Sequence, residues 1–202
     1  MELYIISIEE AAKIPFEYCE RCFPKRMERA KKFRRREDLL RCVGAGFLLE
    51  YAGIREAELL YNEYGKPYIE KDGVFFSLSH SGDFALLAFD SVDAGCDIEK
   101  NDAPHEGVAQ RVFTDSELEW MSVSPEKRFY ELWTLKESVI KLDGRGLGMD
   151  MRSFSVLPMT HGKPILSENG MIYGKSTQYG DCTVSVCSKK PIGETVLRCV
   201  KW

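Results

Sequence analysis

The chain has 202 residues, enough for one large domain or two small ones. Hydrophobic residues make up 44% of it and charged residues 30%, which is typical of a folded globular protein and unlike a disordered or membrane-spanning chain. The net charge of −4 argues against broad electrostatic binding of nucleic acid.

The first residues carry no basic leader, and acids flank their apolar stretch, so we expect a strand over residues 2–8 instead of a secretory signal. Seven cysteines at irregular spacings predict reduced thiols and a cytoplasmic location. Cys19 and Cys22 form a C-x-x-C without the second pair that a zinc site needs, and we interpret it as accidental.

Residues 15–52 predict helices in two or three pieces, with Pro24 as a break. Apolar residues recur at helical spacing in the last piece and predict a buried face: Leu39, Leu40, Val43, Phe47 and Leu48. Three strands are expected next, the first two forming a hairpin: residues 74–79, 84–89 and 92–98.

A polar linker follows at residues 100–107. Helices are then expected near residues 108–113, 116–123 and 125–143, and strands joined by turns over 154–202, with alternation at 182–187 and 195–202. Strands and helices thus follow one another twice. The predicted fold class is α+β, with two similar lobes, residues 1–100 and 101–202, each an antiparallel sheet packed by helices.

The charge is spread unevenly along the chain. Residues 25–41 contain nine Lys/Arg and three Asp/Glu, a local balance of +6 that leaves −10 for the rest. This segment is either a solvated amphipathic helix or a docking place for an anion or an acidic partner.

Asp97 and Glu99 stand at i and i+2 on a strand, so their carboxylates point to the same side of a sheet. Glu137 and Lys141 lie one turn apart on a predicted helix. Without a function, Asp97 and Glu99 would be a strand end that faces solvent, and Glu137 and Lys141 would be an i,i+4 ion pair on the helix surface. Together, three carboxylates and a lysine favour chemistry on a diphosphate with bound magnesium.

Ser79 and His80 are neighbours on a strand, so their side chains diverge, which argues against a serine nucleophile with its own base. They form either a hydrogen-bonded strand end or a clamp for an anion. The glycines at 144 and 146 follow a helix, which favours a C-terminal cap over a phosphate-binding loop.

Several of these motifs coincide with one family. The sequence GCDIE at 95–99, followed by WTLKESVIK at 133–141, resembles the signature of the 4′-phosphopantetheinyl transferases. FSLSHS at 76–81, EYGKP at 63–67 and the basic segment ending at Arg41 resemble its two-lobed, surfactin-synthetase-activating branch.

The resemblance implies a pseudo-dimer of two lobes in one chain, with coenzyme A and magnesium bound in the cleft between them. It implies transfer of the phosphopantetheine arm to a serine of an acidic apo carrier protein, with release of 3′,5′-adenosine bisphosphate. It further implies a monomer without nucleic-acid or membrane partners.

By the same resemblance, Asp97, Glu99 and Glu137 would bind magnesium and Lys141 would meet the diphosphate. Glu137 is the favoured base, and Glu117 is the other contender. The resemblance places coenzyme A contacts on Arg26, Arg29, Arg41, Lys66, Pro67, Ser79, His80 and Lys141. Cys42 stands where the family often has a hydroxyl residue.

Two other function classes remain open at this point. Asp97 to Lys100 could serve a magnesium-dependent nuclease, in which Glu99→Ala would abolish DNA cleavage. A non-catalytic module that binds coenzyme A or a carrier protein would leave the carrier's mass unchanged.

Overall fold

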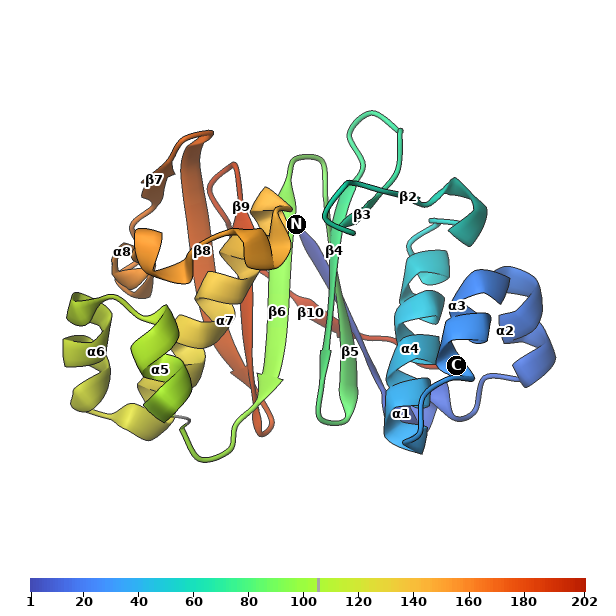
Figure 1. Cartoon of the computed structure of the whole chain (residues 1–202). Helices are drawn as coiled ribbons and strands as arrows, with labels where there is room; N and C mark the ends of the chain where they lie inside the picture. The colour runs from blue at the N-terminus through green and yellow to red at the C-terminus, as the bar shows by residue number, and fades with distance from the viewer. Residues whose placement is uncertain (105) are drawn as a thin grey trace.

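The computed structural model describes residues 1–104 and 106–202, apart from the side chain of Leu147, and its helices lie at two opposite ends of the molecule with strands between them (Figure 1). One sheet has the strand order β10-β1-β5-β4 and the other β6-β9-β8-β7. The expected α+β class is confirmed, with a four-stranded sheet and packed helices in each lobe.

The N-terminal half contains β1 (Glu2–Ser7), α1 (Ile8–Ala11), α2 (Phe16–Cys22), α3 (Pro24–Ala30), α4 (Arg36–Tyr51), β2 (Leu60–Tyr61), β3 (Pro67–Tyr68), β4 (Phe75–Ser81) and β5 (Phe84–Asp90). The remainder contains β6 (Ala94–Lys100), α5 (Glu106–Val112), α6 (Asp115–Ser122), α7 (Pro125–Asp143), α8 (Leu157–Thr160), β7 (Ile165–Ser167), β8 (Gly170–Tyr179), β9 (Cys182–Ser188) and β10 (Leu197–Cys199).

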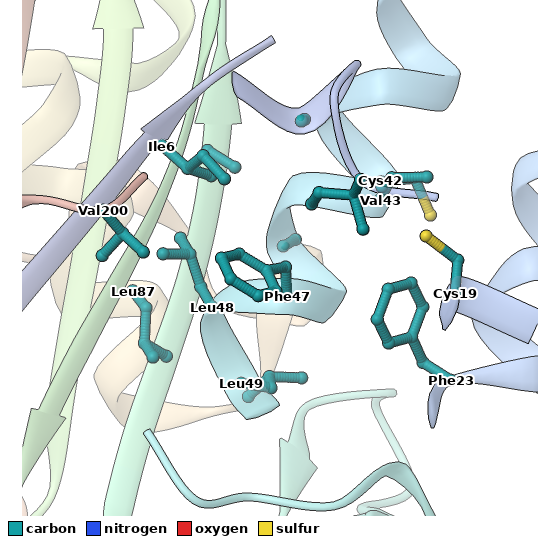
Figure 2. Close-up of a cluster of buried hydrophobic side chains, with 14 of the residues drawn as sticks. Ile6, Cys19, Phe23, Cys42, Val43, Phe47, Leu48, Leu49, Leu87 and Val200 are labelled. Carbon is teal, nitrogen blue, oxygen red and sulfur yellow. The ribbon is translucent and has the colours of Figure 1, made fainter. Parts of the chain in front are cut away.

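Helix α4 carries the core of the N-terminal lobe. Its Val43, Phe47 and Leu48 are buried as the helical spacing predicts, and they pack toward Leu87 of β5 and Ile6 of β1 (Figure 2). Pro24 does separate two helices, because α2 ends at Cys22 and α3 begins at the proline.

Helix α7 lies over β6 and β9 in the other lobe. Its N-terminus has Pro125 at the first helical position, and it ends at Gly144, whose φ of 90° is left-handed. The preceding helix α6 begins with a capping box between Thr114 and Glu117.

A third apolar cluster joins the two sheets. It contains Leu3 and Leu86 from one sheet and Ile98 and Val184 from the other, all buried. The lobes therefore share a continuous interior, and burial of this seam fixes how β4 and β6 face each other.

The sheets differ from the sequence prediction in their connections. Strand β6 lies before residue 101 but pairs with β9, and β10 pairs with β1. The β1–β10 pairing is parallel, whereas the other strand pairings of the two sheets are antiparallel, so the sheets are largely antiparallel as expected. The division at residues 100 and 101 and the pseudo-dimeric relation stay predictions, and each lobe borrows one strand from the other side of that division.

All seven cysteines are free thiols, as expected from their spacing. Within residues 1–104 and 106–202, no helix is both long and apolar enough to cross a membrane.

Candidate active site

A cleft of about 420 Å³ lies where the two lobes meet. Its lining combines basic side chains from α3, backbone and side chains of β4, and acids from β6 and α7. The lining residues are Arg26, Arg29, Ala45, Tyr61, Gly65, Pro67, Leu78, Ser79, His80, Asp97, Glu99, Trp133, Glu137 and Lys141. Most of the residues singled out from the sequence are thus brought together.

The two carboxylates of β6 line this cleft, as the i,i+2 spacing predicts. Asp97 is only 2% exposed, and its Oδ1 accepts a hydrogen bond of 2.7 Å from Ser79 Oγ. Glu99 accepts one of 2.6 Å from Ser81 Oγ, and the Trp133 indole approaches its other oxygen at 3.5 Å. Both acids are therefore held in place by hydroxyl groups of the neighbouring strand.

The serines of β4 also join the two sheets. The amides of Cys96, Ile98 and Lys100 donate to the hydroxyls of Ser77, Ser79 and Ser81, at 3.1, 3.3 and 3.1 Å. These bonds replace the backbone ladder that a paired strand would supply.

Sequence reasoning missed this role of the serines. Their alternation at every second position signals a polar face on β4, but nothing in the sequence indicates that β6 would cover it.

Glu137 and Lys141 reach the cleft from α7. Lys141 Nζ lies 2.6 Å from Asp97 Oδ1 and 2.8 Å from Ser79 Oγ. The helix can lie this close to β6 because Gly95 has no side chain. A Cβ built there would stand 1.9 Å from the carbonyl oxygen of Ser138.

The acids in the cleft repel one another. Burial raises the pKa of Glu137 to about 7, with the negative charge of Asp97 adding to the effect and Lys141 opposing it. Burial likewise raises the pKa of Glu99. Burial lowers the pKa of Lys141, but its hydrogen bond to Asp97 and the negative charges around it, chiefly those of Asp97 and Glu137, together raise that pKa overall. The cleft thus carries more buried negative charge than its one ammonium group balances.

The opposite wall is basic. Arg26 and Arg29 come from α3, and the Nε of Arg26 is buried without a hydrogen-bond partner. Partial burial lowers the pKa of the His80 imidazole, and the charges of Lys141, Arg41 and Arg26 lower it further. A buried, unpartnered guanidinium nitrogen indicates that this wall can receive an anion.

Two of the expected coenzyme A contacts, Arg41 and Lys66, do not line the cleft. Arg41 donates to the carbonyl of Gly82 and pairs with Asp38, and it is absent from the lining. Pro67 lines the cleft, whereas Lys66 lines an adjoining cavity of about 300 Å³. The Lys66 ammonium is bonded to the carbonyl of Leu142 at 2.8 Å.

The structure argues against Glu117 as the catalytic base. Its side chain is 0% exposed and pairs at 2.9 Å with Lys136, which is equally buried. Its oxygens also accept from the amides of Thr114 and Val156 at 2.8 Å. A carboxylate enclosed in this way cannot reach a substrate hydroxyl, so Glu117 fastens α6 to the core and is not a base of the cleft.

The acids were also expected to hold magnesium. Across the described part of the chain, no three His, Cys, Asp or Glu side chains are gathered closely enough to form a ready metal site. The donor set nevertheless fits a hard cation. Asp97 Oδ2 is buried without a partner, and Glu137 and Glu99 share the same cleft.

Comparison with known proteins adds the family. Residues 93–187 match the model of the 4′-phosphopantetheinyl transferase superfamily. The chain is 33% identical over 150 residues to the 4′-phosphopantetheinyl transferase AcpT of Escherichia coli K12, covering 68% of this chain and 75% of that protein. It is 34% identical over 145 residues to the 4′-phosphopantetheinyl transferase Sfp of Bacillus subtilis, covering 66% of this chain and 65% of Sfp.

A mouse relative is the L-aminoadipate-semialdehyde dehydrogenase-phosphopantetheinyl transferase, 36% identical over 116 residues, covering 47% of this chain and 38% of that protein. The chain spans just under two thirds of the length of the Bacillus subtilis relatives. The region matched by the superfamily model contains the acids of β6 and all of α7. The chain therefore belongs to the 4′-phosphopantetheinyl transferase superfamily, in the branch that includes the Bacillus Sfp proteins.

Proposed function

We propose that the chain transfers the 4′-phosphopantetheine arm of coenzyme A to a serine of an apo carrier protein and releases 3′,5′-adenosine bisphosphate. One observation carries this proposal. An acidic cluster with a lysine faces a basic wall across a single interlobe cleft, in a chain of this superfamily. Coenzyme A has the matching charges, because its diphosphate and 3′-phosphate are anionic.

The basic wall is proposed to hold the nucleotide. Arg26 and Arg29 would face the 3′-phosphate, with His80 beside them, and Pro67 would border the adenine. Arg41 lies near enough to affect the His80 pKa, so we keep it as a supporting positive charge. Ser79 acts indirectly, since its hydroxyl is already bonded to Asp97 and Lys141.

The acidic wall is proposed to hold magnesium through Asp97, Glu99 and Glu137. When bound, magnesium would neutralise charge that develops on the diphosphate. Lys141 supplies a fixed positive charge from the protein itself, held beside Asp97 at 2.6 Å. This charge stabilises the leaving phosphate ester in the same way.

The reaction needs one proton acceptor. The carrier's serine oxygen forms a bond to the phosphorus that bears the pantetheine group, while the bond from that phosphorus to the bridging oxygen breaks. The serine proton must leave, and Glu137, whose carboxylate lines the cleft, is the proposed acceptor. The bisphosphate departs with the bridging oxygen.

The carrier is proposed to be acidic. Many basic residues of the segment 25–41 are exposed, among them Lys25, Lys32 and Arg35, so they can attract an acidic surface.

Release of 3′,5′-adenosine bisphosphate tests the activity. We expect stoichiometric release from coenzyme A with magnesium only when an apo carrier is present. Release without a carrier would indicate a hydrolase, and no release across a panel of apo carriers would favour a binding module.

A further inference from the structure

The short hairpin β2–β3 crosses from the N-terminal lobe to the end of α7. Lys66 Nζ donates to the carbonyl of Leu142 at 2.8 Å, and Asn62 Nδ2 donates to the carbonyl of Gly144 at 2.9 Å. The last carbonyls of a helix have no partner within it, and a cation is favoured there by the helix dipole. Two side chains of one lobe thus cap the main helix of the other.

Asn62 is fixed for this task by its own turn. Its Oδ1 accepts from the amides of Tyr64 and Lys66 at 3.0 and 2.8 Å, which leaves the Nδ2 group directed at Gly144. The backbone of Asn62 also pairs with the carbonyl of Lys66 at 3.0 Å. The hairpin is therefore a small rigid unit.

Gly144 gives independent support for close docking. A Cβ built at this position would lie 2.9 Å from Lys66 Cδ and 3.2 Å from Asn62 Nδ2. The residue also has a left-handed φ of 90°. Glycine is required here both to end the helix and to admit the two capping side chains.

The hairpin and the helix both contribute to the cleft. Gly65 and Pro67 line it from the hairpin, and Glu137 and Lys141 line it from α7. The two capping bonds therefore join two elements that both line the cleft.

We propose that Lys66 and Asn62 are positioning residues that hold the β2–β3 hairpin against the end of α7 and so keep the substrate cleft at its working width. The catalytic part of this inference rests on the proposed transferase function. The structural part does not, because the contacts exist in the protein without substrate.

Two isosteric variants separate this role from direct contact with coenzyme A. Lys66→Met keeps an unbranched side chain of similar length and removes the ammonium group that donates to Leu142. Asn62→Asp keeps the oxygen that holds the turn and removes the donor to Gly144. Lys71→Met is the matched control, because Lys71 is an exposed lysine just beyond the hairpin.

The first measurement is hydrogen–deuterium exchange of the substrate-free protein. Both capping variants should exchange about ten-fold faster over residues 60–68 and 139–146, while Lys71→Met matches the wild type. Both should also lower kcat/KM for coenzyme A about ten-fold. Circular dichroism would first confirm that each variant is folded.

Unchanged exchange in both variants would overturn the proposal. So would a loss of coenzyme A affinity in Lys66→Met alone, with Asn62→Asp like the wild type, because that result assigns Lys66 to the substrate. If both capping variants exchange faster but the wild-type protein modifies no carrier, the cap is supported and only the proposed function is removed.

Discussion

Replacing Glu137 by glutamine should stabilise the magnesium-free protein while abolishing transfer. The folded protein holds the Glu137 proton with a pKa of about 7, against 4.5 for an ordinary glutamate. At about 1.36 kcal/mol per pH unit, this interval corresponds to about 3 kcal/mol of stability lost when the carboxylate is ionised.

The sign follows from proton linkage. Between pH 4.5 and 7 the folded state binds the proton more tightly than the unfolded state, so wild-type stability falls as pH rises through that window. Glutamine cannot ionise and escapes the penalty. The variant should therefore gain about 3 kcal/mol at pH 8 and under about 1 kcal/mol at pH 5.

Urea denaturation in EDTA at these two pH values measures the effect. Glu126→Gln is the control, because Glu126 is an exposed glutamate on the same helix. Added magnesium should stabilise the wild type and leave Glu137→Gln nearly unchanged. A variant that is no more stable than the wild type at pH 8 would refute the reasoning that Glu137 is a buried, repelled carboxylate.

Four further results are expected. Gly95→Ala should lower the free energy of unfolding by at least about 3 kcal/mol in urea titrations, because its Cβ would meet the backbone of α7; a milder loss would contradict that close approach. Glu117→Ala should cost about 3–5 kcal/mol in the same assay by leaving Lys136 buried and unpaired, and an unchanged midpoint would argue against the pair. His80→Ala should weaken coenzyme A more than dephospho-coenzyme A in calorimetry; equal losses would place His80 away from the 3′-phosphate. Wild-type affinity for coenzyme A should rise from pH 7.5 to 6. The pKa of His80 is lowered in the free protein, and a bound phosphate would raise it again by favouring the protonated imidazole. A flat profile in this range would oppose that assignment.

Local signals in the sequence were sufficient for several elements. The proline at 125 and the glycine at 144 give the bounds of α7 because both act on the backbone at their own positions. The i,i+2 spacing of Asp97 and Glu99 correctly predicts that both line one cavity, since side chains alternate along any strand.

Features that depend on distant partners were not predictable in this way. Strand β10 is short, and its partner β1 lies at the other end of the chain. Strand β9 is buried along its whole length, because α7 covers one face and the other sheet covers the opposite face. The alternation of its polar and apolar residues therefore does not mark a side that faces solvent. The extended region 154–202 also hides the short helix α8.

The chemistry of a side chain does not reveal what it faces. Glu117 and Glu137 are equally acidic in sequence, yet one is enclosed with Lys136 and the other opens to the cleft. Lys66 belongs to a family motif, but its ammonium caps α7. Packing decides these roles, and packing is a property of the folded chain.

Intact mass spectrometry of an apo carrier protein tests the central claim most directly. Incubation with coenzyme A, magnesium and this protein should add one phosphopantetheine group to the carrier, at its serine, and Glu137→Gln should add none. A carrier that keeps its mass across a panel of fatty acid, polyketide and peptide carriers, or full modification by Glu137→Gln, would contradict the account.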